Sequence, residues 1–155
     1  MKKNSVSDYS PSLAELVKRG DVKPFNADPT EVASLIEIAE RDVKRAQKNL
    51  EEGDLDWALA VAYNALLQAA RAWMFFKGYR PAFGEGHVVV TRFATATLEK
   101  SFGEEIFVLD VLRRKRHAAV YERAGSVTEF EAKHAIETAK RFVSFVKEKT
   151  RAITN

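Results

Sequence analysis

The residues best equipped for chemistry lie in one short stretch of the chain, from Leu112 to Tyr121. This stretch carries four successive cationic side chains, a histidine and a tyrosine within three turns of a predicted helix. At about 3.6 residues per turn, one face of that helix presents Arg113, Arg116, His117, Val120 and Tyr121. The face therefore combines groups that can hold a phosphate with a group that can move a proton.

Cleavage of a phosphodiester without a metal ion requires a cation for the phosphorane, a base for the attacking 2′-hydroxyl and an acid for the leaving oxygen. We expect Arg113 and Arg116 to bind phosphate, because a planar guanidinium matches two phosphate oxygens. His117 can act as base or acid near neutral pH. Tyr121, with an ordinary pKa of about 10, can donate a proton but is a poor base. The competing interpretation is a solvated basic helix face with one capped histidine.

Arg71 is a second candidate for phosphate binding, because it interrupts an otherwise apolar segment. An unpaired cation there would be costly, so Arg71 must meet a carboxylate, backbone carbonyls or a cleft. An ion pair with Glu99 or Glu105 explains it as well as a functional role does. Tyr63, on the same segment, is expected to be a packed aromatic with a hydrogen-bonded hydroxyl.

Other classes of function find little support in the composition. The chain has no cysteine, which excludes disulfides and thiolate nucleophiles and fits a reducing compartment. Its three histidines lie on separate segments without a ligand spacing, so we expect no metal site and no cofactor. No secretion signal is visible, and polar residues interrupt the most apolar run, 57–76, which indicates a core helix and not a membrane span. We therefore expect a cytoplasmic protein. The net charge of +3 does not by itself imply nucleic acid.

The elements that position these residues are predicted to be helices. Ser10-Pro11 and Asp28-Pro29 each join a cap residue to a proline at the first helical position, and Thr128 with Glu131 forms a capping-box pattern. The predicted helices cover residues 11–18, 29–52, 55–77, 87–100, 104–123 and a last segment that follows Thr128 and includes Ile153. Residues 21–26 are expected to be a connector and 79–86 a loop. The fold class is therefore all-α, an antiparallel bundle of four to five helices. Residues 1–28 form an N-terminal extension with a short helix, and residues 29–155 form the helical domain.

Between residues 39 and 146 the chain resembles the HEPN domain family. The central part of the resemblance is the run 57–65, continued by Arg71-Ala72-Trp73 and by residues 77–81, and Gly86-His87 opens the next helix as in the family. HEPN ribonucleases carry an arginine, a polar residue, three variable residues and a histidine, and Arg116 to Tyr121 stands at that motif.

The resemblance implies a helical bundle that dimerises through its motif helices, with Ile106, Leu109 and Val120 helping the contact. It also implies a composite cleft between two motif copies. Active members are metal-independent endoribonucleases, often toxins paired with a small nucleotidyltransferase antitoxin. By position, Arg116 would bind phosphate, His117 would be the polar motif residue, and Tyr121 replaces the catalytic histidine.

This replacement leaves two functions open. The first is an RNA-directed endoribonuclease or toxin component in which His117 acts one turn earlier than the motif histidine. The second is a non-catalytic module that binds RNA, a nucleotide or a partner nucleotidyltransferase. The replacement of histidine by Tyr121 is also compatible with a third possibility, a substrate that differs from that of the HEPN ribonucleases.

Overall fold

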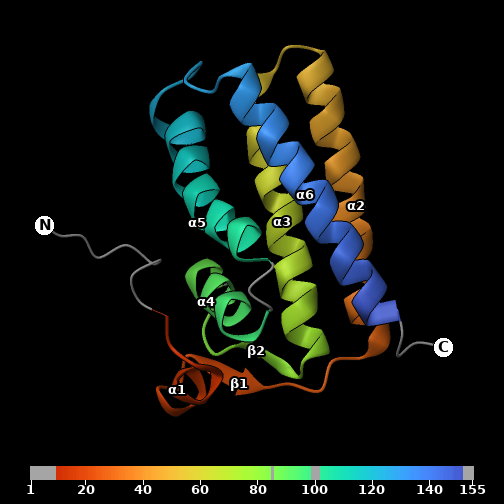
Figure 1. Cartoon of the computed structure of the whole chain (residues 1–155), viewed down its shortest axis with the longest axis vertical. Helices are drawn as coiled ribbons and strands as arrows, with labels where there is room; N and C mark the ends of the chain where they lie inside the picture. Colours follow the sequence, from red (N-terminus) through yellow and green to blue (C-terminus); the bar gives the residue numbers. More distant parts are fainter. Residues whose placement is uncertain (1–9, 85, 99–101, 152–155) are drawn as a thin grey trace, which may run out of the picture.

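The computed structural model describes residues 10–84, 86–98 and 102–151, except for the side chains at positions 104, 106 and 107. Four long helices form an antiparallel bundle, as the sequence predicts: α2 (Pro29–Glu51), α3 (Leu55–Phe76), α5 (Gly103–His117) and α6 (Glu129–Arg151) (Figure 1). Two shorter helices, α1 (Leu13–Lys18) and α4 (His87–Thr97), lie toward one end of the bundle (Figure 1). Among the described residues, no helix has the length and apolarity needed to cross a membrane.

The helix starts follow from reciprocal caps that the sequence already shows. At α2, the Thr30 backbone N–H donates to Asp28 Oδ1 at 2.9 Å, and the Asp28 N–H donates to Glu31 Oε2 at 2.9 Å. At α6, the Thr128 N–H donates to Glu131 Oε1 at 2.9 Å, and the Glu131 N–H donates to Thr128 Oγ1 at 3.1 Å. These bonds satisfy backbone donors that the first helical turn leaves without partners. The predicted cap of the first helix is wrong, because Ser12 and not Ser10 caps α1, two residues later.

A small sheet replaces part of the predicted connector and loop. Strand β1 (Val22–Pro24) pairs antiparallel with β2 (Tyr79–Pro81), with Val22 opposite Pro81 and Pro24 opposite Tyr79. Three residues are too short to show the alternation that identifies a strand, and each strand ends in a proline, which usually argues against one. The pairing ties the chain that precedes α2 to the segment that follows α3.

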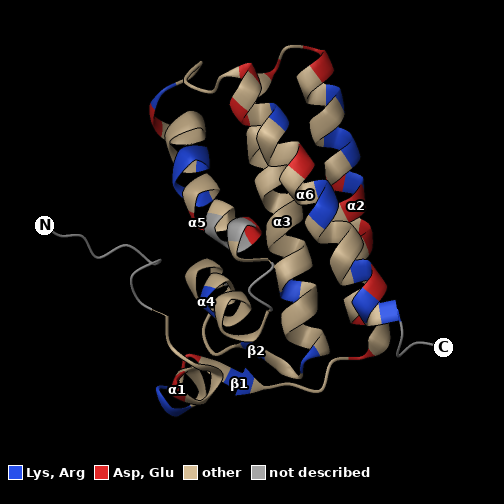
Figure 2. Cartoon of the chain, in the orientation of Figure 1, with Lys and Arg blue, Asp and Glu red and all other residues tan. Residues whose placement is uncertain are grey.

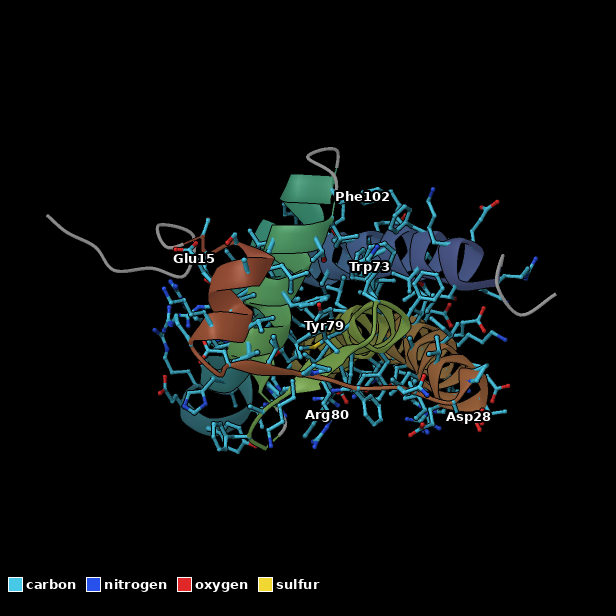
Figure 3. The ribbon with its side chains drawn as sticks, turned by 90° about the horizontal axis from the view of Figure 1, so that it is seen from below. Glu15, Asp28, Trp73, Tyr79, Arg80 and Phe102 are labelled. Atoms are coloured by element: carbon cyan, nitrogen blue, oxygen red, sulfur yellow. The ribbon has the colours of Figure 1, made fainter. Side chains whose placement is uncertain are left out.

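Helix α3 is the centre of the core and contacts α2, α6, α4 and α5. Small residues on several of its faces, among them Ala58, Ala62 and Ala69, are completely buried and let the neighbouring helices approach closely. Near its lower end the indole of Trp73 lies between α3 and α6, where it packs against Phe145 and donates a hydrogen bond to Thr97 Oγ1 at 2.9 Å (Figure 3).

Two predicted packing residues lie elsewhere than expected. Phe130 is 77% exposed, since it sits in the first turn of α6, and it stacks on His134 instead of lining the core. Leu109 is 2% exposed within the protein's own core, so it cannot help a contact between subunits. Val120 is half-buried. Other residues that the sequence analysis used lie outside the described residues or side chains: Glu99, Lys100, Ile106 and Ile153.

Candidate functional site

The helix that carries the basic stretch changes its winding in the middle of the motif. Helix α5 ends at His117 and continues as a π turn, η3 (Ala118–Glu122), in which the Arg123 N–H donates to Ala118 O at 2.6 Å. The prediction of one uninterrupted α-helix to Arg123 is wrong in this detail. In an α-helix, residues five apart point about 140° away from each other, whereas a π turn brings them to the same side. The guanidinium carbon of Arg116 lies 5.7 Å from the centre of the Tyr121 ring.

His117 and Tyr121 both lie on the surface. Their side chains are 61% and 64% exposed, and their ring centres are 5.1 Å apart. His117 Nε2 lies 3.5 Å from Glu122 Oε2, an exposed pair that contributes little to stability. The imidazole and the phenol are therefore reachable from solvent, beside the guanidinium of Arg116.

Lys and Arg residues colour much of α5 blue in Figure 2, and the four cations of the stretch have different surroundings. Lys115 faces α6, where its Nζ donates to the Ser126 carbonyl and lies 3.5 Å from Glu131 Oε2. Arg114 donates to the buried carboxylate of Asp110 at 3.0 Å. Lys115 thus links α5 to the start of α6, and Arg114 pairs within its own helix.

The side chain of Arg113 is half-buried. Its Nη2 lies 3.6 Å from Asp110 Oδ1, and its side chain remains about one-third exposed. Its Nε is buried without a hydrogen-bond partner among the described residues. A buried N–H without an acceptor is costly and uncommon in folded proteins.

A pocket of about 370 Å³ joins the start of α4 to α5. It is lined by Gly86, His87, Val88, Val89, Arg113, Arg116 and His117. The cap residue of α4 is Gly86, which has no side chain with which to satisfy the first backbone N–H groups. The positive end of a helix and two guanidiniums therefore border the same space, a combination that suits an anion such as phosphate. Three of the predicted site residues, Arg113, Arg116 and His117, meet here.

His87 is the residue of this pocket that the sequence analysis did not select. Its Nδ1 lies 3.4 Å from the hydroxyl oxygen of Tyr63, which comes from the centre of α3 and is 2% exposed. Burial raises the pKa of Tyr63, and the nearby guanidiniums of Arg113, Arg116 and Arg71 act in the opposite direction. The only signal in the sequence was the position of His87 directly after a glycine-rich loop, at the start of a helix.

Arg71 acts on Tyr63 together with Arg113 and Arg116, but it does not line the pocket. It is half-exposed, its Nη1 lies 3.4 Å from Gln68 Oε1, and its charge acts on Tyr63. Glu105, one of its two expected partners, forms an ion pair with Arg141 at 3.3 Å. Arg71 is therefore on α3 and does not line the pocket, whereas Arg113 and Arg116 do.

Comparisons with known proteins agree with this fold. The model of the HEPN domain matches residues 32–149. A solved structure of TT1696 from Thermus thermophilus is 24% identical, with a TM-score of 0.60 over 76% of this chain and 97% of that chain. A second, of ST0689, an archaeal HEPN homologue, is 22% identical, with a TM-score of 0.61 over 77% of this chain and 97% of that chain. Curated proteins give no significant match.

Proposed function

Because the chain belongs to the HEPN domain family, we propose that it is an RNA-directed protein that cleaves a phosphodiester without a metal ion. The observation that carries this proposal is the pocket in which Arg113, Arg116 and His117 lie together at the start of α4. Two guanidiniums and a helix N-terminus are suited to the non-bridging oxygens of one phosphate. An imidazole in the same pocket can exchange protons near neutral pH.

In the proposed reaction the 2′-hydroxyl of a nucleotide attacks the adjacent phosphorus, and the 5′-oxygen of the next nucleotide leaves. Arg113 and Arg116 offset the charge that develops on the phosphorane oxygens. His117 takes part in the proton transfers, and Tyr121 donates a hydrogen bond but does not act as the base. The products are a 2′,3′-cyclic phosphate and a 5′-hydroxyl.

We further propose that the protein acts as a homodimer in which the second copy faces the exposed side chains of His117 and Tyr121. The family resemblance implies such a contact through the motif helices. In a toxin–antitoxin pair, a small nucleotidyltransferase with an acidic face would cover the same basic surface. Either partner would exclude water from side chains that are more than half exposed in a single chain.

The test is cleavage of single-stranded RNA in the presence of EDTA. The wild-type protein is expected to cut, and Arg116→Ala and His117→Ala are each expected to lose about 10²- to 10⁴-fold in rate. His134→Ala is the matched control, since this exposed histidine lies on α6 outside the pocket. RNA that stays intact with a folded wild-type protein in excess would contradict cleavage.

Binding without cleavage is the second candidate, and the surroundings of Tyr121 favour it. Its exposed ring lies 5.7 Å from the Arg116 guanidinium and 5.1 Å from the His117 ring, a surface on which an RNA base can stack. This candidate predicts that RNA stays intact. It also predicts that the logarithm of the binding constant falls by about 0.7 per phosphate contact for each tenfold rise in salt concentration. Binding that does not depend on salt would favour a protein partner instead.

A further inference from the structure

His87 is more buried than His117 and His134, and it lies near two arginines of the pocket. It begins α4, is half-buried and lines the same pocket as Arg113 and Arg116. His117 lines that pocket from α5, and its side chain is 61% exposed. The pocket of one chain therefore holds two imidazoles, on two different helices.

The backbone fixes the place of His87. Gly86 adopts φ +58°, and a Cβ on this residue would come within 2.8 Å of the Cβ of Pro81 at the end of β2. The loop therefore closes directly onto the small sheet. Thr91 Oγ1 donates to the His87 carbonyl at 3.0 Å, one turn into α4. A residue held in this way suits a role that depends on position.

Tyr63 fixes the orientation of the His87 ring. Its hydroxyl is 3.4 Å from Nδ1, and burial raises its pKa, so the phenol stays neutral over the range in which histidine titrates. A neutral hydroxyl can accept a hydrogen bond from Nδ1–H in both charge states of the ring. Tyr63 acts here as a positioning residue.

The motif itself has only one imidazole, because tyrosine replaces histidine at position 121 and is a poor base. Transesterification requires a base and an acid, and an imidazole suits either role near neutral pH better than a phenol does. We propose that His87 is a catalytic residue that forms the acid–base pair with His117 within the pocket of a single subunit. One histidine takes the 2′-hydroxyl proton as the new O–P bond forms, and the other gives a proton to the 5′-oxygen as its bond to phosphorus breaks.

This inference rests on the proposed cleavage of RNA, and it makes a specific statement about pH. The charged and titratable groups around the pair come from three elements. Helix α3 contributes Tyr63 and Arg71, and α5 contributes Asp110, Arg113 and Arg116. The π turn η3 contributes Tyr121 and Glu122, and Glu122 Oε2 lies 3.5 Å from His117 Nε2. Removal of one histidine from a two-histidine site is expected to remove one limb of a bell-shaped profile of kcat against pH.

The test compares His87→Gln with the wild-type full-length chain. We expect kcat to fall by about 10²- to 10⁴-fold and one limb of the pH profile to disappear. Affinity for RNA with a 2′-deoxy sugar at the cleavage site should change less than about threefold, because the arginines that bind phosphate are retained. Tyr63→Phe should displace the same limb, and His134→Gln should behave as wild type. Circular dichroism and urea unfolding verify that each variant folds.

A substrate with sulfur in place of the leaving 5′-oxygen separates the two roles. A thiolate leaves without a proton, so the variant that lacks the acid should regain cleavage and the variant that lacks the base should not. The proposal therefore expects one of His87→Gln and His117→Gln to be rescued. Rescue of both or of neither would overturn the pairing.

The remaining outcomes separate this inference from the proposed function. If His87→Gln cleaves RNA as fast as the wild type while His117→Gln does not, the role of His87 is excluded and cleavage stands. If the wild-type protein is inert in EDTA, cleavage and the role of His87 are both excluded.

Discussion

Tyr63 shows how a single buried side chain can link a core to a site. Its ring belongs to the core of α3, while its hydroxyl contacts His87 at the pocket, with three guanidiniums close enough to affect it. Tyr63 therefore contributes both to the stability of the core and to the orientation of the His87 ring. Its protonation state is set mainly by burial, since desolvation is the strongest influence on its pKa.

Tyr63→Phe should therefore change the dependence of stability on alkaline pH. The pKa of Tyr63 is raised in the folded protein. The contribution of Tyr63 to the free energy of unfolding is therefore complete below its pKa of about 10 in the unfolded chain. That contribution is lost as the pH rises through the pKa of Tyr63 in the folded protein. Below about pH 10 the variant should lose roughly 0.5–1.5 kcal/mol in the free energy of unfolding, the typical value of one hydrogen bond. Urea unfolding of both proteins between about pH 8 and pH 11 measures the difference. A difference that stays constant across this range would contradict the assignment.

The sequence predicted that Arg113, Arg116 and His117 lie together, but it did not distinguish the surroundings of each cation. Arg113 and Arg116 were expected at the phosphate, and both line the pocket. Lys115 lies in the same run, yet its partners are Ser126 and Glu131, which the fold alone brings close. His87 escapes sequence reasoning for the same reason, because its contact with Tyr63 spans 24 positions of sequence and follows no local spacing.

At the scale of elements, the start of α4 determines the shape of the pocket. Gly86 serves as its cap with a positive φ, and the close approach of Pro81 leaves no room for a side chain there. A residue with a Cβ would be strained at this φ and would also collide with the end of β2. The first turn of α4 would then move, together with His87.

Gly86→Ala is expected to lower stability by more than about 1 kcal/mol and to weaken RNA binding. Gly84→Ala is the matched control, because Gly84 has φ +54° while a Cβ there would meet nothing within 4 Å. Both variants carry the cost of the backbone conformation, and only Gly86→Ala adds the collision with Pro81. Urea unfolding and RNA affinity of the two proteins give the comparison. Equal losses in both would show that the contact with Pro81 is unimportant.

Elements that depend on local chemistry were predicted well from the sequence, and elements that depend on distant contacts were not. The capping residues Asp28 and Thr128 act on their own helices, so the starts of α2 and α6 follow from the residues themselves. Strands β1 and β2 exist only because the fold brings 22–24 to 79–81. For the π turn at 118–122, which contains Tyr121, we find no local signal in the sequence.

For the molecule as a whole, the arrangement of α3, α4 and α5 brings every group of the proposed reaction into one chain. Helix α4 crosses the end of the bundle beside α5 (Figure 1), and the pocket lies between these two helices. The family resemblance implied a composite cleft with contributions from two motif copies. With Arg116, His87 and His117 around one pocket of a single chain, the second subunit of the proposed dimer would cover the site and would not complete it.

This arrangement predicts the result of mixing two inactive variants. In a dimer of Arg116→Ala with His87→Gln, every pocket contains one defective residue if each subunit supplies its own arginine and histidine. No cleavage should therefore return after subunit exchange, which is measured with single-stranded RNA in EDTA. A mixture of the wild type with the double variant, which keeps one complete pocket in each mixed dimer, should retain about half of the wild-type rate per mixed dimer. Cleavage restored by mixing the two single variants would mean that Arg116 and His87 act across the interface, since only a shared site leaves one pocket intact in that dimer.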